Sequence, residues 1–234
     1  MNNNTLQLKF RQRLNKLASN DYDNIECWQI VEAFNKAQIE WCRRQLVGTN
    51  MRKEGDEQSK RRIDDLQILL TTSTLNGLQR KKFWEGSNFP TNYLEYKRVN
   101  TNAYTKCCKD PRSMTVYLVE EANVDLYLRD PLKKPDFEWG ETFCTMANNN
   151  VRIYTSDDFT IDSPSITYYR KPRNIEIQGC SDPYTNLVSP AMIESEFKDD
   201  IVEVIIDNAV AIVAGDINEV TQYTREGQEA EKNN

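Results

Sequence analysis

Three pairs of adjacent aspartates are the residues with the clearest potential for metal or acid–base chemistry: Asp64-Asp65, Asp157-Asp158 and Asp199-Asp200. Neighbouring side chains on a helix point about 100° apart, so the first and third pairs, in helix-like sequence, are not expected to converge on one ion. The second pair lies in YTSDDFT, a turn-like stretch where carboxylates bond nearby backbone amides. The alternating oxygens and bidentate glutamate of a Ca²⁺ loop are missing, so we predict solvated carboxylates.

The six cysteines are the second candidates for chemistry. Cys107 and Cys108 lie among three cationic residues in YTKCCKDPR, a setting that favours the thiolate. The chain contains no histidine, however, so a nucleophilic thiol would lack its usual base and zinc would lack a common ligand. We expect reduced thiols, with Cys27 and Cys42 acting as small core residues in an amphipathic pattern. The sequence predicts no metal and no cofactor.

Aromatic residues mixed with basic ones are the third candidates, in SITYYRKPR and RKKFWE. Such a mixture can stack nucleic-acid bases, but it also occurs at guarded strand edges and in protein contacts. The net charge of −6 and the pI of about 5.0 argue against a protein that grips phosphates. We therefore assign Tyr169 and Arg170 to a protein contact. Glycine-rich phosphate loops are absent from the sequence.

The elements that must position these residues begin with helices. Leu6, Phe10, Leu14 and Leu17 recur at helical spacing within residues 5–18. A second helix is predicted from the capping signal at Asp23 to Gly48, with an apolar stripe that includes the following residues: Cys27, Ile30, Val31, Phe34, Trp41 and Leu46. Residues 48–62 resemble an exposed loop, and another helix is predicted around Ile63, Leu66, Leu69 and Leu70, ending at Gly77.

Alternation replaces the helical period between residues 78 and 178. MTVYLV and VDLYLR both alternate, and EEAN between them suits a hairpin turn. ANNN before Val151 is a second turn signal. Helix returns at Ser189-Pro190, a pair typical of a helix start, and continues to the C-terminal glycine signal at Gly215.

We therefore predict an α+β fold, in which N- and C-terminal helices pack as a bundle around an inserted small antiparallel β domain. The predicted parts are residues 1–77, 78–188 and 189–234. The last part ends in a polar arm whose weak apolar stripe is too narrow to be buried alone. We predict that this arm docks on another chain through Ile217, Val220, Tyr223 and Arg225. The mean hydropathy of −0.73 fits a chain that buries further surface by assembly.

The chain also resembles virion ring proteins of crAss-like bacteriophages. The resemblance lies in LKFRQRLNKLASNDYDNIECWQIVEAFNKAQIEWCRRQL, in DPLKKPDFEWGETFCTMANNNVRIYTSDDFTIDSPSITYYRKPRNIEIQG and in EFKDDIVEVIIDNAVAIVAGDINEVTQYTREGQEAEKNN. It implies a head-to-tail adaptor that forms a dodecameric ring below the portal and extends the DNA channel. The implied partners are identical subunits, the portal protein, and tail or other ring proteins, with genomic DNA passing unheld.

The leading expectation is thus a structural, non-enzymatic protein of the virion neck, made in the host cytoplasm. One alternative is a lower ring joined to the tail hub. The other is a host-acting enzyme or nucleic-acid-processing protein, against which the missing histidines and scattered acids argue. We expect no signal peptide, because MNNNTLQLKF lacks an apolar h-region, and no apolar run is long enough to span a bilayer.

Overall fold

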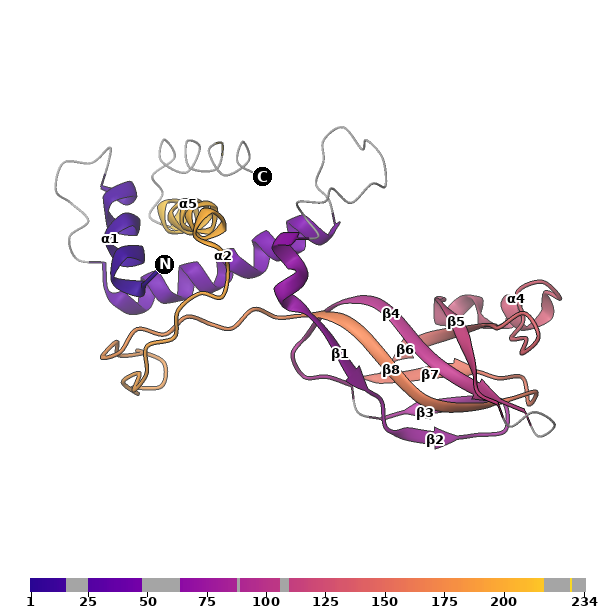
Figure 1. The fold of residues 1–234 in the computed structure, drawn as a ribbon. Coiled ribbons are helices and arrows are strands. Elements are labelled where there is room, and N and C mark those ends of the chain that lie inside the picture. Colours follow the sequence, from indigo (N-terminus) through magenta and orange to yellow (C-terminus); the bar gives the residue numbers. More distant parts are fainter. Residues whose placement is uncertain (16–24, 48–63, 88, 106–109, 217–227, 229–234) are drawn as a thin grey trace. The chain divides into compact units, whose positions relative to one another are not determined.

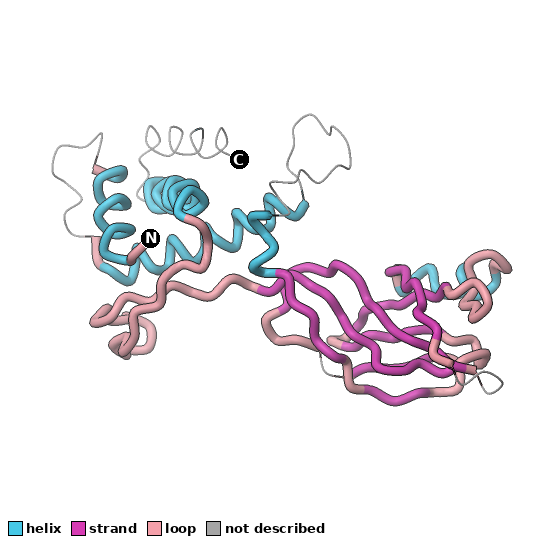
Figure 2. The backbone as a smooth tube through the Cα atoms, viewed as in Figure 1, coloured by secondary structure: helices cyan, strands magenta, loops and turns pink. Residues whose placement is uncertain are grey.

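The computed structural model describes the chain except for residues 16–24, 48–63, 88, 106–109, 217–227 and 229–234 (Figure 1). It divides into two compact units. Unit 1 combines Met1–Ile68 with Pro172–Asn234, and unit 2 is the continuous stretch Leu69–Lys171. Figure 2 shows that the long helices belong to unit 1 and the strands to unit 2. The chain enters the second unit at Leu69 and not at residue 78, and leaves it at Lys171 and not at residue 188.

Unit 1 begins with helix α1 (Asn3–Leu14), whose first turn is capped because the Asn2 side chain accepts a hydrogen bond from Thr5 N. The predicted apolar positions Leu6, Phe10 and Leu14 are buried, which confirms the spacing argument there. Leu17, Asp23 and the predicted loop 48–62 lie outside the described residues. Helix α2 (Cys27–Val47) follows, and Ile30, Phe34 and Trp41 in its predicted stripe are buried.

Helix α5 (Asp199–Asp216) packs against α2 and α1 through a nearly continuous apolar surface. Asp199 and Asp200 in its first turn complement the helix dipole. Arg13 of α1 pairs with Asp207 at 2.7 Å and also with Glu203, so two helices far apart in sequence are joined by ion pairs. The predicted start at Ser189 is wrong. Ser189 N donates to Cys180 O, and its hydroxyl donates to Glu176, so this serine closes a loop and does not cap a helix.

Unit 2 is an eight-stranded mixed sheet, curled into a half-barrel, with the order β1-β8-β4-β5-β6-β7-β3-β2. Its strands are β1 (Leu70–Thr74), β2 (Gly77–Gln79), β3 (Phe83–Gly86), β4 (Tyr93–Tyr104), β5 (Arg112–Leu118), β6 (Glu141–Ala147), β7 (Asn150–Tyr154) and β8 (Thr160–Arg170). The predicted turn before Val151 is confirmed: Asn148 and Asn149 have φ values of 51° and 59°, and they join β6 to β7.

The two ends of this sheet are linked by only Leu75 and Asn76. Leu75 N donates to the backbone oxygen of Pro164 within β8, while Ser87 N, just after β3, donates to Asn76 O. The Gln79 side chain accepts a hydrogen bond from Ile161 N in β8 at 3.1 Å, so it covers part of that strand's backbone. The curl surrounds a core that includes the following buried residues: Trp84, Val99, Met114, Ile153, Ile166 and Tyr168.

The predicted fold class, a terminal helical bundle with a small antiparallel insertion, is wrong. The sheet of eight strands dominates the architecture, and its β5 and β6 pair in parallel. The error begins at VDLYLR, which forms helix α4 (Val124–Arg129) after a 3₁₀ turn (Glu121–Asn123), so that β5 and β6 are joined by a crossover and not by a hairpin.

The helix predicted around Leu66 to Leu70 is also wrong in its second half. A 3₁₀ turn (Gln67–Leu69) leads directly into β1, whose residues pair with β8 from Leu70↔Tyr169 to Thr74↔Ser165. The β-branched threonine run therefore forms a strand and does not end a helix.

Candidate functional site

An extended segment after Pro172 forms one wall of the candidate site, and it lies in no strand of the sheet. Besides isolated bridges to Ile193 and Val188, its backbone is bonded by amide side chains from the helices. Asn35 of α2 accepts from Ile175 N at 2.8 Å and donates to Ile175 O at 3.4 Å. Gln38 donates to Arg173 O at 3.0 Å, and Asn3 of α1 donates to Glu176 O and to Ile193 O. Buried backbone groups need such partners, so these amides fix the path of the segment.

A disulfide between Cys27 and Cys180 ties this wall to the start of α2 across 153 residues of sequence. The expectation that Cys27 is a reduced core residue is therefore wrong. Asp182 organises the next turn, because its carboxylate accepts from Tyr184 N at 2.9 Å and from the Thr185 hydroxyl at 2.9 Å. The segment is thus a constrained loop held at Cys180 and at Asp182.

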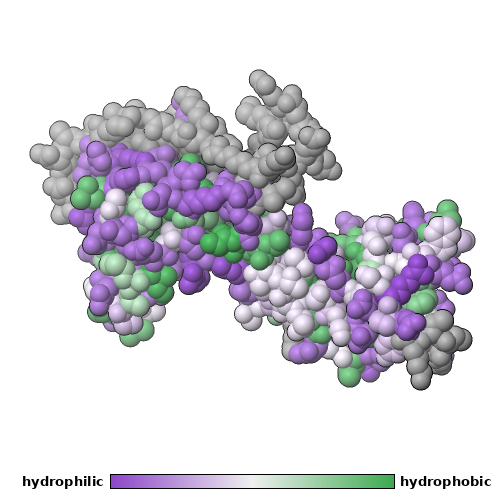
Figure 3. All heavy atoms as spheres, in the orientation of Figure 1, coloured by the Kyte–Doolittle hydropathy of each residue, from purple (hydrophilic) through white to green (hydrophobic). Residues whose placement is uncertain are grey.

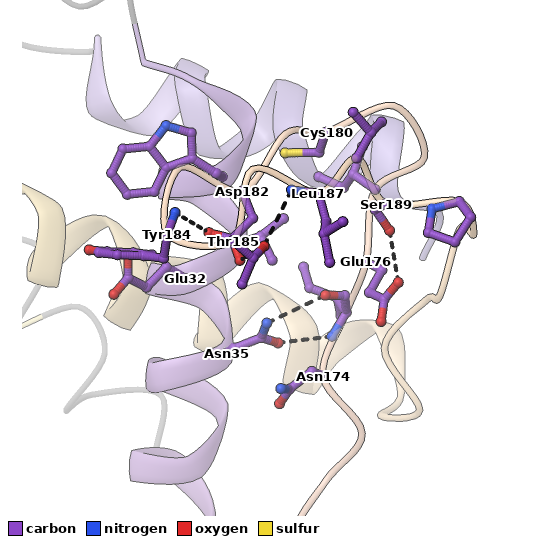
Figure 4. Close-up of a pocket in the computed structure, with 16 residues that line it drawn as sticks. Glu32, Asn35, Asn174, Glu176, Cys180, Asp182, Tyr184, Thr185, Leu187 and Ser189 are labelled. Atoms are coloured by element: carbon purple, nitrogen blue, oxygen red, sulfur yellow. Dashed lines mark hydrogen bonds between the residues drawn. The ribbon is translucent and has the colours of Figure 1, made fainter.

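The cavity between α2 and this loop has a volume of about 540 Å³, within the range of small-molecule and peptide-anchor pockets (Figure 4). Its lining residues include Trp28, Val31, Glu32 and Asn35 from α2, and Ile175, Glu176, Ile177, Asp182, Tyr184, Leu187, Val188 and Ser189 from the loop. Figure 4 shows Glu32 and Tyr184 at one side and Glu176 with Ser189 at the other. The lining is therefore mostly apolar, with polar groups at its margins.

The charged side chains described in the lining of this cavity are all acidic. Glu32, Glu176 and Asp182 line it, and among the residues that the structure describes no lysine or arginine lines it. Glu176 accepts from the Ser189 hydroxyl at 2.8 Å, a hydrogen bond that orients its carboxylate. Clustered acids beside apolar walls attract a cationic group that brings its own apolar surface.

Apolar side chains continue from the cavity onto the surface of the loop. Tyr184 is 76% exposed and Leu187 is 69% exposed, while Val188 and Met192 are also exposed. The Trp28 and Tyr184 rings meet edge to face at 6.0 Å between centroids. Figure 3 shows hydrophobic residues gathered at the tip of unit 1 that this loop forms. An exposed apolar cluster with an adjoining cavity is typical of a protein-binding surface.

Unit 2 carries a different exposed surface, on the connection between β5 and β6. Leu132 is 87% exposed, Trp139 is 77% exposed and Leu126 is 65% exposed. The nearby cavity of about 880 Å³ is lined by four cationic and four acidic side chains, so the charges of its lining balance. The cationic ones are Arg80, Lys81, Arg112 and Lys134, and the acidic ones are Asp136, Glu138, Asp157 and Asp158. The acidic cavity of unit 1 is therefore the more selective of the two for charge.

The sequence-predicted contact residues fall in different places. Tyr169 lies in β8, which pairs with β1 on one side and β4 on the other, and the residue is only 8% exposed. The strand edge considered for SITYYRKPR is thus wrong, since β8 is an interior strand. Arg170 ends that strand and donates to Lys171 O at 3.3 Å. Ile217, Val220, Tyr223 and Arg225 lie outside the described residues.

The candidate catalytic residues do not come together. Asp64 and Asp65 pair with Lys198, and Asp199 pairs with the Met1 amino group at 2.6 Å. Asp157 occupies a turn with φ of 65°. Within the residues that the structure describes, no group of three or more potential metal ligands occurs. Cys107 and Cys108 lie outside that part of the chain.

The two free cysteines of the described residues are both buried. Burial raises the pKa of Cys42 to about 12, and the charge of Glu196 adds to the shift. Burial likewise raises the pKa of Cys144 to about 12. Both thiols therefore stay protonated at neutral pH and are poor nucleophiles.

Sequence reasoning missed this site because its parts are distant in the chain. The alternation of buried Ile175 and Ile177 with polar neighbours was the available signal for an extended wall. Comparison with protein-family models gave no match, and comparison with curated proteins gave no significant match. Among the helices of the described residues, none is both long and apolar enough to cross a bilayer.

Proposed function

We propose that the chain is a structural protein of a bacteriophage virion. Copies of it form a closed, dodecameric ring in the neck, which connects the capsid portal to the tail and extends the DNA channel. The observation that carries the proposal is the exposure of large apolar side chains on both units. Leu132 and Trp139 on unit 2, and Tyr184 and Leu187 on unit 1, are more than two-thirds exposed in the single chain. Such surfaces are typical of a subunit that is completed by assembly.

The charge of the chain supports the same role. A net charge of −6 does not favour a tight grip on phosphates, which suits a passage through which DNA must slide. The polar arm after α5 would dock on the portal. The binding character of the candidate site supports a structural, non-enzymatic role.

The first test is the assembly state and location of the full chain. Mass photometry of the purified protein, alone and with the portal, is expected to reveal a closed species of about 330 kDa, twelve times the 27.3 kDa subunit. Antibody labelling of purified particles of the encoding phage is expected to mark the neck. A protein that stays monomeric with and without the portal, and is absent from particles, would contradict the proposal.

The second test separates a portal-bound ring from a ring at the tail hub. Cross-linking in intact particles is expected to join the segment 217–234 to the portal. Removal of that segment is expected to leave a folded subunit, judged by circular dichroism, that is not incorporated. Normal incorporation of the truncated chain, or cross-links to the tail hub alone, would reject the portal-bound position.

A further inference from the structure

We infer that the acidic cavity of unit 1 receives the Pro131–Lys134 turn from unit 2 of a second copy of the chain. The inference rests on the proposed ring and specifies its subunit contact. This donor turn, Pro131–Lys134, has Leu132 as its apolar anchor and Lys133 and Lys134 as its cationic flank.

The donor turn is built to present its leucine. Leu132 N donates to the Asp130 carboxylate at 3.0 Å, and the backbone N–H groups of Lys133 and Lys134 donate to Asp130 O at 3.1 and 3.0 Å. Pro131 at the start of the turn and Pro135 just after it restrict the backbone. Leu132 is nevertheless 87% exposed. A turn that is already ordered loses little conformational entropy on binding, so its anchor contributes more to affinity.

The receptor matches the donor turn in both polarity and charge. Its walls offer apolar surface from Trp28, Leu187 and Val188, which suits a leucine side chain. Within the described part of the chain, no cation lines the cavity beside its carboxylates, which suits two adjacent lysines, of which Lys133 also pairs with Asp130 of its own copy at 3.6 Å. The cavity volume of about 540 Å³ exceeds what one leucine requires, so part of the flanking turn can enter as well.

The main competitor for this cavity is the C-terminal arm of the chain. Residues 217–234 contain four acidic residues and two basic ones, a net charge of −2. An arm with the same sign of charge as the cavity is repelled, whereas the donor turn is attracted. The acidic arm is therefore better suited to a different partner.

The location of the two surfaces also fits a ring. The receptor belongs to unit 1 and the donor turn to unit 2, so the two contacting surfaces are different parts of the chain. Contacts between unlike surfaces propagate from copy to copy and close into a ring where the rotation between copies closes, whereas contacts between identical surfaces end at a dimer.

Substitution of the anchor is the direct test. In the full chain, Leu132→Asp is expected to weaken subunit association at least tenfold in mass photometry, because a charge would enter an acidic apolar cavity. Leu78→Asp is the matched control, since Leu78 is 65% exposed on edge strand β2 and lies outside both surfaces. Hydrogen exchange of β5 and β6 verifies that each variant is folded.

Charge reversal tests the pairing itself. Lys133→Glu with Lys134→Glu is expected to weaken association, and Glu32→Lys in the same chain is expected to restore part of it. Glu40→Lys, two turns further along α2, is the control and should restore nothing. Restoration by Glu40→Lys equal to that by Glu32→Lys would show a general effect of net charge and overturn the inference.

The outcomes separate the inference from the proposed function. A ring that forms normally with Leu132→Asp, in solution or in particles, refutes this contact but leaves the ring function intact. If the ring forms only in particles, the measurement is the amount of each variant incorporated into particles. The variants are then expected to rank in the same order as for association in solution. Absence of any ring from both settings, for the unsubstituted chain, removes the proposed function and the contact together.

Discussion

The two units satisfy their backbone hydrogen bonds in different ways. In unit 2, strand pairing does so along a sheet of eight strands. In unit 1, the segment after Pro172 lies in no strand and has only isolated bridges, Glu176 with Ile193 and Ser181 with Val188. The side chains of Asn3, Asn35 and Gln38 bond further backbone groups of this segment. The comparison teaches that the sheet depends on a repeated backbone pattern, whereas the candidate site depends on a few individual side chains and one disulfide. We expect unit 1 to be the more sensitive to single substitutions.

The largest expected effect comes from the disulfide. Replacing Cys27 and Cys180 by alanine is expected to lower the free energy of unfolding of unit 1 by about 2–4 kcal/mol. The bond closes a span of 153 residues, for which an unstructured loop would give about 5 kcal/mol. Unit 2 lies inside that span, and a folded unit 2 shortens the effective loop, so the smaller value is expected.

Hydrogen exchange measured peptide by peptide checks this difference. Protection should fall in α2 and in the loop after Cys180, while the strands of unit 2 keep theirs. A reducing agent should reproduce the effect in the unsubstituted chain and change nothing in the double variant. Equal loss of protection in both units would show that they unfold together and would break the comparison.

An intermediate effect is expected at Asn35. Asn35→Ala removes both side-chain hydrogen bonds to Ile175, whose side chain is fully buried, at a cost of about 1–3 kcal/mol. Asn102→Ala is the control in unit 2, because this exposed residue of β4 keeps its strand pairing, and a change of about 0.5 kcal/mol or less is expected. Urea denaturation of both variants measures the difference. A cost at Asn102 as large as that at Asn35 would contradict the dependence of unit 1 on its amides.

The smallest expected effect should be alike in the two units. The pKa of Cys42 in unit 1 and of Cys144 in unit 2 is raised to about 12 from an ordinary value near 9. The folded state therefore keeps each thiol proton after the unfolded state has lost it. The stabilisation is fully present below pH 9 and is lost as the pH rises toward 12, about 1 kcal/mol per thiol by pH 10.

Unfolding curves at pH 8 and pH 10 measure this loss in each unit. Cys42→Ala should reduce the loss in unit 1 and leave that in unit 2 unchanged. The quantity to compare is the change in the free energy of unfolding between pH 8 and pH 10, because the alanine also leaves a small cavity that lowers stability at both pH values. A loss in unit 1 that is unchanged by Cys42→Ala would assign the pH dependence to other groups.

The sequence predicted elements well where one local period dominated. Leu6, Phe10 and Leu14 gave α1, and the alternation through Met114 and Val116 gave β5. The sequence-based prediction was wrong at VDLYLR, where the choice between a strand and a helix depended on packing against residues distant in the chain. Val124, Tyr127 and Leu128 pack at helical spacing on a cluster around Phe143 and Tyr154, while Leu126, counted in the alternation, is exposed.

The candidate site was less predictable than the fold. Nothing near Glu32 in the sequence indicates that Glu176 and Asp182 share its cavity. The pairing of Cys27 with Cys180 brings these residues together, and six cysteines without a spacing motif do not specify a connectivity. Ser189 shows the same limit, because its cap-like sequence serves a loop that only the folded unit forms.

The chain enters unit 2 through β1 and leaves it through β8. Leu70 and Tyr169 lie directly opposite each other in the register of these two neighbouring strands. The whole sheet is therefore a cassette with two adjacent junctions. Recombination can insert, remove or exchange such a cassette as a block, since a host fold has to accommodate only one closely spaced pair of chain crossings. Relatives of this protein could in this way differ entirely in the sheet while retaining the helices that surround it in the sequence.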